Sequence, residues 1–181
     1  HCPPTETFER DAMYALFDEL VVEGKIAGYG VSVETVAQAR IAIAHPNIAS
    51  LQIIANPFRL KPFETVIPEA AAAGVGVIVR VPLASGLLAA KYSLDSTFAN
   101  NDHRNYNRDG QAFDVGETFS GVPYAIGVTA ARELGDLAPK GVTPAEAALR
   151  WPLHGLASAL LWPKVRQQLV GGRLRTAISG G

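Results

Sequence analysis

Short apolar runs alternate with amphipathic helical segments through the first half of the chain. The strand-like runs are residues 26–32, 51–55 and 75–81. The helical segments, in which apolar side chains recur every three or four positions, are residues 7–22, 36–44 and 63–73. The run at 75–81 is almost continuously apolar, which is typical of a parallel strand covered on both faces. This alternation predicts an α/β fold with parallel strands and right-handed crossovers.

Capping residues indicate where helices begin and end. Gly24 follows the first helical segment and suits the left-handed backbone that often closes a helix. Two more helices are expected over residues 124–137 and 143–151. In the second of these, Thr143 is the expected N-cap and Glu146 its partner in a capping box.

A long polar segment, residues 95–122, interrupts the alternation. It is rich in Asn, Asp, Arg and Gly, with aromatic residues interleaved. A segment of this length inside a compact domain is usually a functional loop or a disordered one. His103 and Arg104 within it are interpreted either as substrate contacts or as residues that order the loop.

The composition limits the classes of protein that the chain can represent. With 48% hydrophobic residues and a net charge of -1 over 181 residues, it can bury a sizeable core and offers no basic surface for nucleic acid. No apolar run is long enough to span a membrane, so a soluble protein is expected. The one cysteine, Cys2, cannot form an internal disulfide, which suits a cytoplasmic location. We find no metal-ligand spacing, P-loop or Gly-x-Gly-x-x-Gly sequence.

The last apolar run, residues 156–162, predicts a fourth strand. Four βα units are about half of an eight-stranded barrel, or else a small open doubly wound sheet. The chain begins His-Cys-Pro-Pro, without Met or a signal segment, and we interpret it as starting within a longer polypeptide. This start favours the half barrel.

Six segments, in order and in register, resemble the aldo-keto reductase family. They are Glu23 to Ser32, Leu51 to Asn56, Gly74 to Ile78, Val81-Pro82-Leu83-Ala84-Ser85-Gly86-Leu87-Leu88, Lys91-Tyr92 and Ala148-Leu149-Arg150-Trp151. The long polar segment, with Asp102-His103-Arg104-Asn105, is similar to a bacterial subgroup of that family. The resemblance implies a partial (β/α)8 TIM barrel made of about the last four βα units, residues 1–181, in which residues 152–181 match poorly and are interpreted as a possible aberrant tail.

The resemblance also implies an NADP(H) site at the carboxyl ends of the strands. Ser32 and Gln52 match the family residues that hydrogen-bond the nicotinamide amide, although Val33 stands where the family usually has asparagine. Arg80 occupies the place of an aromatic ring that stacks on nicotinamide, and a planar guanidinium can also stack.

The loop after the third strand matches the segment that lies against the cofactor pyrophosphate in the family. Its expected cofactor-binding residues are Pro82, Leu83, Ser85, Gly86 and Leu87, with Lys91 close by in the sequence. A glycine permits close backbone approach, and a serine can donate to a phosphate oxygen. Farther along, Lys164 and Arg166 are candidate ligands of the 2′-phosphate.

Each of these residues also has a structural interpretation. Gln52 could satisfy a neighbouring backbone group, and Ser32 could end a strand or cap the next helix. Arg80 could pair with a carboxylate inside the barrel. Ser85 and Gly86 could form only a turn, and Lys91 and His1 could be ordinary surface groups.

Of the family's catalytic set, only the histidine that orients the carbonyl has a match, which is His1. The tyrosine that donates the proton, and the lysine and aspartate that tune it, have no match at the required positions. The implied function is an NADP(H)-dependent reduction of aldehydes or ketones, with the chain inactive alone.

Two other functions remain open. One is a non-catalytic half barrel that binds nucleotide or a protein partner, and the other is a different phosphate-binding barrel enzyme. Expected partners are a small carbonyl substrate and, through exposed strand edges, a second copy of the chain.

Overall fold

The structure, a computed structural model, describes residues 2–150 of the 181-residue chain. The chain divides into two compact units. Within the described residues, the sheet unit comprises residues 2–55 and 60–80, and the loop unit comprises residues 56–59 and 81–150. Each is described by itself below.

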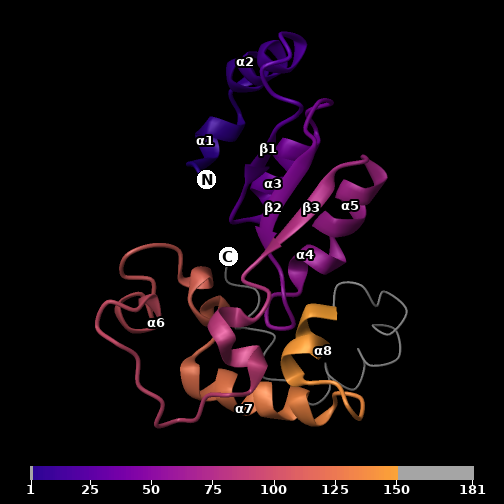
Figure 1. Ribbon diagram of the computed structural model, residues 1–181. Coiled ribbons are helices and arrows are strands. Elements are labelled where there is room, and N and C mark those ends of the chain that lie inside the picture. Colours follow the sequence, from indigo (N-terminus) through magenta and orange to yellow (C-terminus); the bar gives the residue numbers. More distant parts are fainter. Residues whose placement is uncertain (1, 151–181) are drawn as a thin grey trace. The chain divides into compact units, whose positions relative to one another are not determined.

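Three parallel strands form the centre of the sheet unit, in the order β1-β2-β3 (Figure 1). They are β1 (Gly30–Ser32), β2 (Ser50–Ile54) and β3 (Gly76–Arg80). In the register, Gln52 of β2 is opposite Ser32 on one side and Ile78 on the other. The predicted α/β fold with parallel strands is therefore confirmed for this part of the chain.

One face of the sheet packs on helices, and the other face is more open. Leu51 and Ile53 of β2 are buried, with Val77 of β3 packed against the same core. On the opposite face, Gln52 is half-buried and the Ile78 side chain is 51% exposed. The expectation that the third strand is covered on both faces is thus wrong within the described residues, because helices cover only the side of Val77.

The helices of the sheet unit follow the expected order but are more divided. They are α1 (Thr5–Phe8), α2 (Asp11–Val22), α3 (Val36–Ile43), α4 (Lys61–Glu64) and α5 (Val66–Ala72). The predicted helix at 63–73 is interrupted at Thr65, whose backbone is not helical. Pro68 explains the break, because its ring would clash with the carbonyl of Glu64 in a continuous helix. The predicted helix at 7–22 is likewise two helices, for which no local signal is evident.

The first strand is shorter than predicted because residues before it complete the end of α2. Gly24 adopts the expected left-handed backbone, and the amides of Lys25 and Ile26 both bond back to the carbonyl of Leu20. Pairing with β2 then begins only at Gly30. A Cβ atom at Gly30 would lie 2.2 Å from the Ser50 hydroxyl oxygen, so the two strands approach closely there.

The loop unit contains mostly short elements. They are η1 (Ala84–Ala89), α6 (His103–Tyr106), η2 (Val115–Glu117), η3 (Phe119–Gly121), α7 (Tyr124–Asp136) and α8 (Pro144–Arg150). Phe119, Leu87 and Leu88 form its core together with Val128 and Leu134 of α7. The predicted capping box at the start of α8 is confirmed, since Thr143 and Glu146 bond to each other's backbone amides.

The long polar segment is ordered by buried polar side chains. Asn107 is fully buried, and its amide donates to the Thr118 hydroxyl while its oxygen accepts from the amides of Ala112 and Phe113. Asn56 is also buried and donates to the Ser120 hydroxyl. The segment is therefore a folded loop with its own hydrogen-bond framework.

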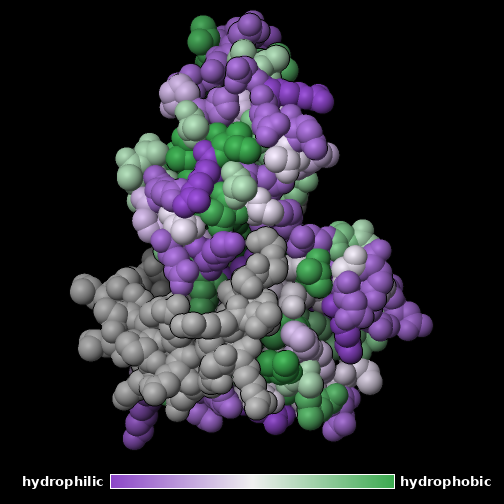
Figure 2. Space-filling model, turned by 180° about the vertical axis from the view of Figure 1, so that it is seen from behind, coloured by the Kyte–Doolittle hydropathy of each residue, from purple (hydrophilic) through white to green (hydrophobic). Residues whose placement is uncertain are grey.

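Hydrophobic side chains reach the surface among hydrophilic ones, as Figure 2 shows from one side. In the sheet unit, the exposed large hydrophobic residues include Leu16, Val22 and Ile78. None of the helices in residues 2–150 is long and apolar enough to cross a membrane. The predicted fourth strand at 156–162 lies outside the described residues, so the four-unit partial barrel is not confirmed.

Candidate cofactor site

Two polar side chains meet at the carboxyl end of the sheet. The Ser32 hydroxyl at the end of β1 donates to the Oε1 atom of Gln52 on β2 at 3.1 Å. The Cys2 sulfur lies 3.1 Å from the same hydroxyl, and the Cys2 amide bonds to the Ser32 carbonyl. Either atom can be the donor in the Cys2–Ser32 contact.

This chain of hydrogen bonds fixes which end of the Gln52 amide is offered to a ligand. Its oxygen accepts from Ser32, whereas its nitrogen has no hydrogen-bond partner among residues 2–150. Gln52 is only half-buried, so the two N–H donors are accessible. A carboxamide group, whose oxygen accepts such hydrogen bonds, fits this donor set.

A second contact crosses the middle strand at the same end of the sheet. Arg80, the last residue of β3, donates to the Glu34 carboxylate just after β1 at 2.9 Å. Only 12% of the Arg80 side chain and 17% of the Glu34 side chain are exposed. The structural interpretation of Arg80, pairing with a carboxylate, is therefore confirmed, and Glu34 is a member of this site that the sequence did not reveal.

The surroundings of Cys2 hold its thiol in the neutral form. Burial raises the pKa of the Cys2 thiol, and the Glu34 carboxylate raises it further. The Ser32 hydroxyl and the Arg80 charge act in the opposite direction but do not reverse the shift. A thiol with a raised pKa is a weak nucleophile at neutral pH.

The loop that matches the family's pyrophosphate segment is a tight turn in the loop unit. Ala84, Leu87 and Leu88 are buried, whereas Pro82, Leu83, Ser85 and Gly86 are half-buried. Ala84, Ser85 and Gly86 all have positive φ, with 94° at Gly86. A Cβ at Gly86 would also lie 2.8 Å from the Tyr92 hydroxyl oxygen, so glycine is required there on two grounds.

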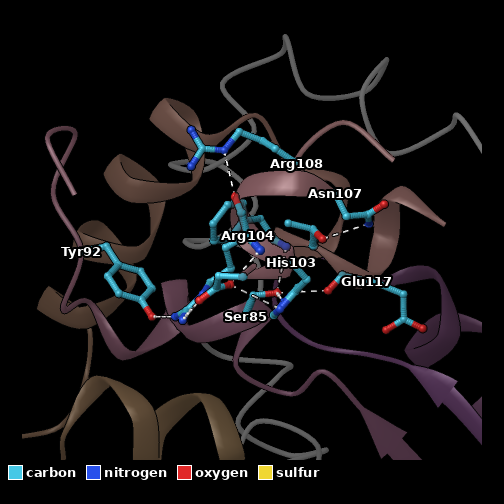
Figure 3. Close-up of polar contacts among 10 residues, drawn as sticks. Ser85, Tyr92, His103, Arg104, Asn107, Arg108 and Glu117 are labelled. Carbon is cyan, nitrogen blue, oxygen red and sulfur yellow. Dashed lines mark hydrogen bonds and ion pairs between the residues drawn. The ribbon is translucent and has the colours of Figure 1, made fainter. Parts of the chain in front are cut away.

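Ser85 ties this turn to the long polar segment (Figure 3). Its hydroxyl donates to the Glu117 carbonyl and accepts from the Phe119 amide, each at 3.1 Å. The His103 Nε2 atom lies 3.4 Å from the same oxygen. In this conformation, the Ser85 proton is directed to the protein backbone.

Arg104 has an ordering role in the same segment. It binds the Asp102 carboxylate through Nε and Nη2, and its Nη1 contacts the Tyr92 hydroxyl (Figure 3). The guanidinium lies 4.6 Å from the Phe98 ring centre. These bonds lower the pKa of the Asp102 carboxyl. Lys91 is exposed and lies over the Tyr92 ring at 5.4 Å.

Three of the predicted site residues, His1, Lys164 and Arg166, lie outside the described residues. The sequence also missed Glu34, Cys2 and Glu117 as contacts of the predicted residues. For Glu34 a signal existed, since the carboxyl ends of parallel strands lie at one edge of a sheet. Glu117 contributes its backbone carbonyl, which leaves no mark in the sequence. No group of metal-ligating side chains occurs among residues 2–150.

Parallel strands with helices on one face and polar side chains at their carboxyl ends are typical of α/β folds whose sites lie at the strand ends. The aldo/keto reductase family model matches residues 1–176, so the chain belongs to that family. The family fold is the TIM barrel, of which three parallel strands are described here.

A comparison with solved structures identifies a similar protein, the glycerol dehydrogenase AKR11B4 from Gluconobacter oxydans. The two share 28% sequence identity with a TM-score of 0.56, over 75% of this chain. The match covers 39% of the dehydrogenase, so the chain spans about two fifths of its length. A comparison with curated proteins found no match.

Proposed function

We propose that the chain forms the NADP(H)-binding part of an aldo-keto reductase that reduces aldehydes or ketones to alcohols. The observation that carries this proposal is the Ser32–Gln52 hydrogen bond, which leaves the Gln52 amide nitrogen to bind a carboxamide. The likeness to a glycerol dehydrogenase supports a reaction between an alcohol and a carbonyl compound. The nicotinamide cofactor would supply the hydride when bound.

The chain's own residues would bind and orient the cofactor. Gln52 donates to the carboxamide oxygen, and Ser32 keeps the Gln52 amide in the orientation that allows it. The Arg80 guanidinium offers a planar surface beside them. His1 would orient the carbonyl of the substrate, as its match in the family does.

The phosphate groups would be held by other segments of the chain. The backbone of the turn at 82–87 and the exposed charge of Lys91 are proposed for the pyrophosphate. Lys164 and Arg166 are proposed for the 2′-phosphate, which gives a preference for NADPH over NADH. The Ser85 hydroxyl would serve the pyrophosphate only after releasing Glu117.

Cofactor binding is tested by titrating the 181-residue chain with NADPH and recording its fluorescence. We expect a saturable signal, and Gln52→Ala should raise the Kd roughly tenfold because a hydrogen bond to the cofactor is lost. Gln111→Ala is the matched control, since Gln111 is exposed and its side chain bonds to neighbouring Asp109. A wild-type chain that gives no saturable signal would contradict the proposal.

Turnover is tested separately. Because the family's tyrosine, lysine and aspartate have no matching positions among these residues, we expect the chain alone not to oxidise NADPH with carbonyl substrates. Glyceraldehyde and an aromatic aldehyde are suitable probes. Steady NADPH consumption at an ordinary enzymatic rate would show that the catalytic groups have been misassigned.

A further inference from the structure

The ion pair between Glu34 and Arg80 lies beside the proposed nicotinamide site. Arg80 ends β3 and Glu34 follows β1, so their contact spans the carboxyl end of β2. The Ser32–Gln52 bond joins β1 to β2, and Ser32 is two residues before Glu34 in the chain. Neighbouring strands are about 4.8 Å apart, so the pair and Gln52 belong to one small polar patch.

The charge of this patch bears on which form of a nicotinamide cofactor is favoured. The nicotinamide ring carries a positive charge when oxidised and none when reduced. A guanidinium without a balancing carboxylate would repel the oxidised ring and leave the reduced ring unaffected. Because both side chains are largely buried, solvent screens the interaction only weakly.

We propose that Glu34 is a positioning residue that neutralises Arg80 and so allows the site to bind both the oxidised and the reduced cofactor. The carboxylate holds the guanidinium across the end of β2 and cancels its charge towards the ring. This inference rests on the proposed function, because it needs a nicotinamide at Gln52. It assigns to Glu34 a role in setting the ratio of the two affinities.

A purely structural role for the pair predicts a different outcome. If Glu34 and Arg80 only join two strands, their loss weakens the fold and changes both affinities by the same factor. The ratio of the Kd for NADP⁺ to the Kd for NADPH then stays constant. This ratio is therefore the measurement that separates the two roles.

The experiment uses the 181-residue chain, with NADPH measured by fluorescence and NADP⁺ by displacement of NADPH. In Glu34→Gln, we expect the ratio of Kd(NADP⁺) to Kd(NADPH) to rise on the order of tenfold. In Arg80→Gln, the remaining carboxylate attracts the cation, so the ratio should fall. The double variant should return the ratio close to the wild-type value.

Glu69→Gln is the matched control, because Glu69 forms the more exposed ion pair with Arg40 in the same unit. It should leave the ratio unchanged. If Glu34→Gln does not fold, Arg80→Gln still tests the proposal, because in that variant the ratio of Kd(NADP⁺) to Kd(NADPH) should fall. An unchanged ratio in the folded variants overturns the inference but leaves the proposed function standing. A wild-type chain that binds neither form overturns both.

Discussion

The sheet unit and the loop unit position their polar side chains by different means. In the sheet unit, backbone pairing sets the register, and the register brings Ser32 to Gln52. In the loop unit, side chains hold the backbone, as where Ser85 bonds to the main chain of Glu117 and Phe119. In the sheet unit, the loss of one side chain leaves the backbone bonds between strands in place. In the loop unit, the fold depends on a few buried side chains, so the loss of one of them should have a larger effect.

The largest expected loss of stability from a single substitution is at a core aromatic residue of the loop unit. Phe119→Ala removes a side chain that is 1% exposed and packs on Tyr124 and Phe98, so we expect a loss of about 3 to 5 kcal/mol in the free energy of unfolding. Hydrogen exchange should show the lost protection in residues 84–137, with the β2 amides retained. Phe113→Ala, at a 41% exposed site, is the control. Equal loss of protection in both units would contradict the comparison.

A pH titration examines the sheet unit by itself. Burial raises the pKa of Tyr29 to about 12. The Asp18 carboxylate, which accepts a hydrogen bond from the Tyr29 hydroxyl, contributes to this shift. A raised pKa means that the contribution to stability is complete below the unfolded value near 10 and is lost as the pH rises through 12. A two-unit shift corresponds to roughly 2 to 3 kcal/mol.

Chemical denaturation at pH 9 to 12 should therefore show a falling free energy of unfolding in the wild type. In Tyr29→Phe the part of this slope that is due to Tyr29 should vanish. Tyr106→Phe, at a 46% exposed site in the loop unit, is the control variant. The same alkaline slope in Tyr29→Phe as in the wild type would show that other groups cause it.

Helix caps give the smallest expected effects, and they compare the two units directly. Thr35 caps α3 in a capping box with Gln38, whose buried amide also bonds to Thr5. Thr143 caps α8 in an exposed box. We expect Thr35→Ala to cost about 1 to 2 kcal/mol and Thr143→Ala about 0.5 to 1 kcal/mol in thermal unfolding. If Thr143→Ala lowered the free energy of unfolding more than Thr35→Ala, the burial of Gln38 would not make the Thr35 cap the stronger one.

The sequence predicted several features of both units because their patterns are local. The apolar runs, Gly24 and the Thr143 capping box each depend on a few neighbouring residues. Pro68 was also a local signal for the helix break at Thr65. The regular spacing of apolar residues on either side nevertheless predicted one continuous helix. In contrast, β1 is short because the backbone amides of residues 25 and 26 bond to α2. The spacing of apolar residues gives no information about such bonds.

For two of the candidate site residues, Ser32 and Gln52, the family motif and the strand register point to the same place. Ser32 and Gln52, which the resemblance assigned to the same cofactor group, lie in adjacent strands and are hydrogen-bonded to each other. The Glu34 partner of Arg80 lies 46 residues away in the chain, and pairing at that separation depends on the strand order. The partners of Ser85 are backbone groups 32 and 34 residues later, for which side-chain identity gives no information.

The left-handed backbone of the turn after β3 has a consequence for the order of folding. Val81, Ala84, Ser85 and Ala90 adopt positive φ although none is glycine, at a cost of about 1 kcal/mol or more each. Backbone bonds within the turn offset part of this cost, and the bonds of the Ser85 hydroxyl to the main chain of residues 117 and 119 offset more of it. The turn therefore lacks part of its stabilisation while the chain is still being synthesised up to residue 116. It should form late in refolding, after the sheet amides have become protected from exchange.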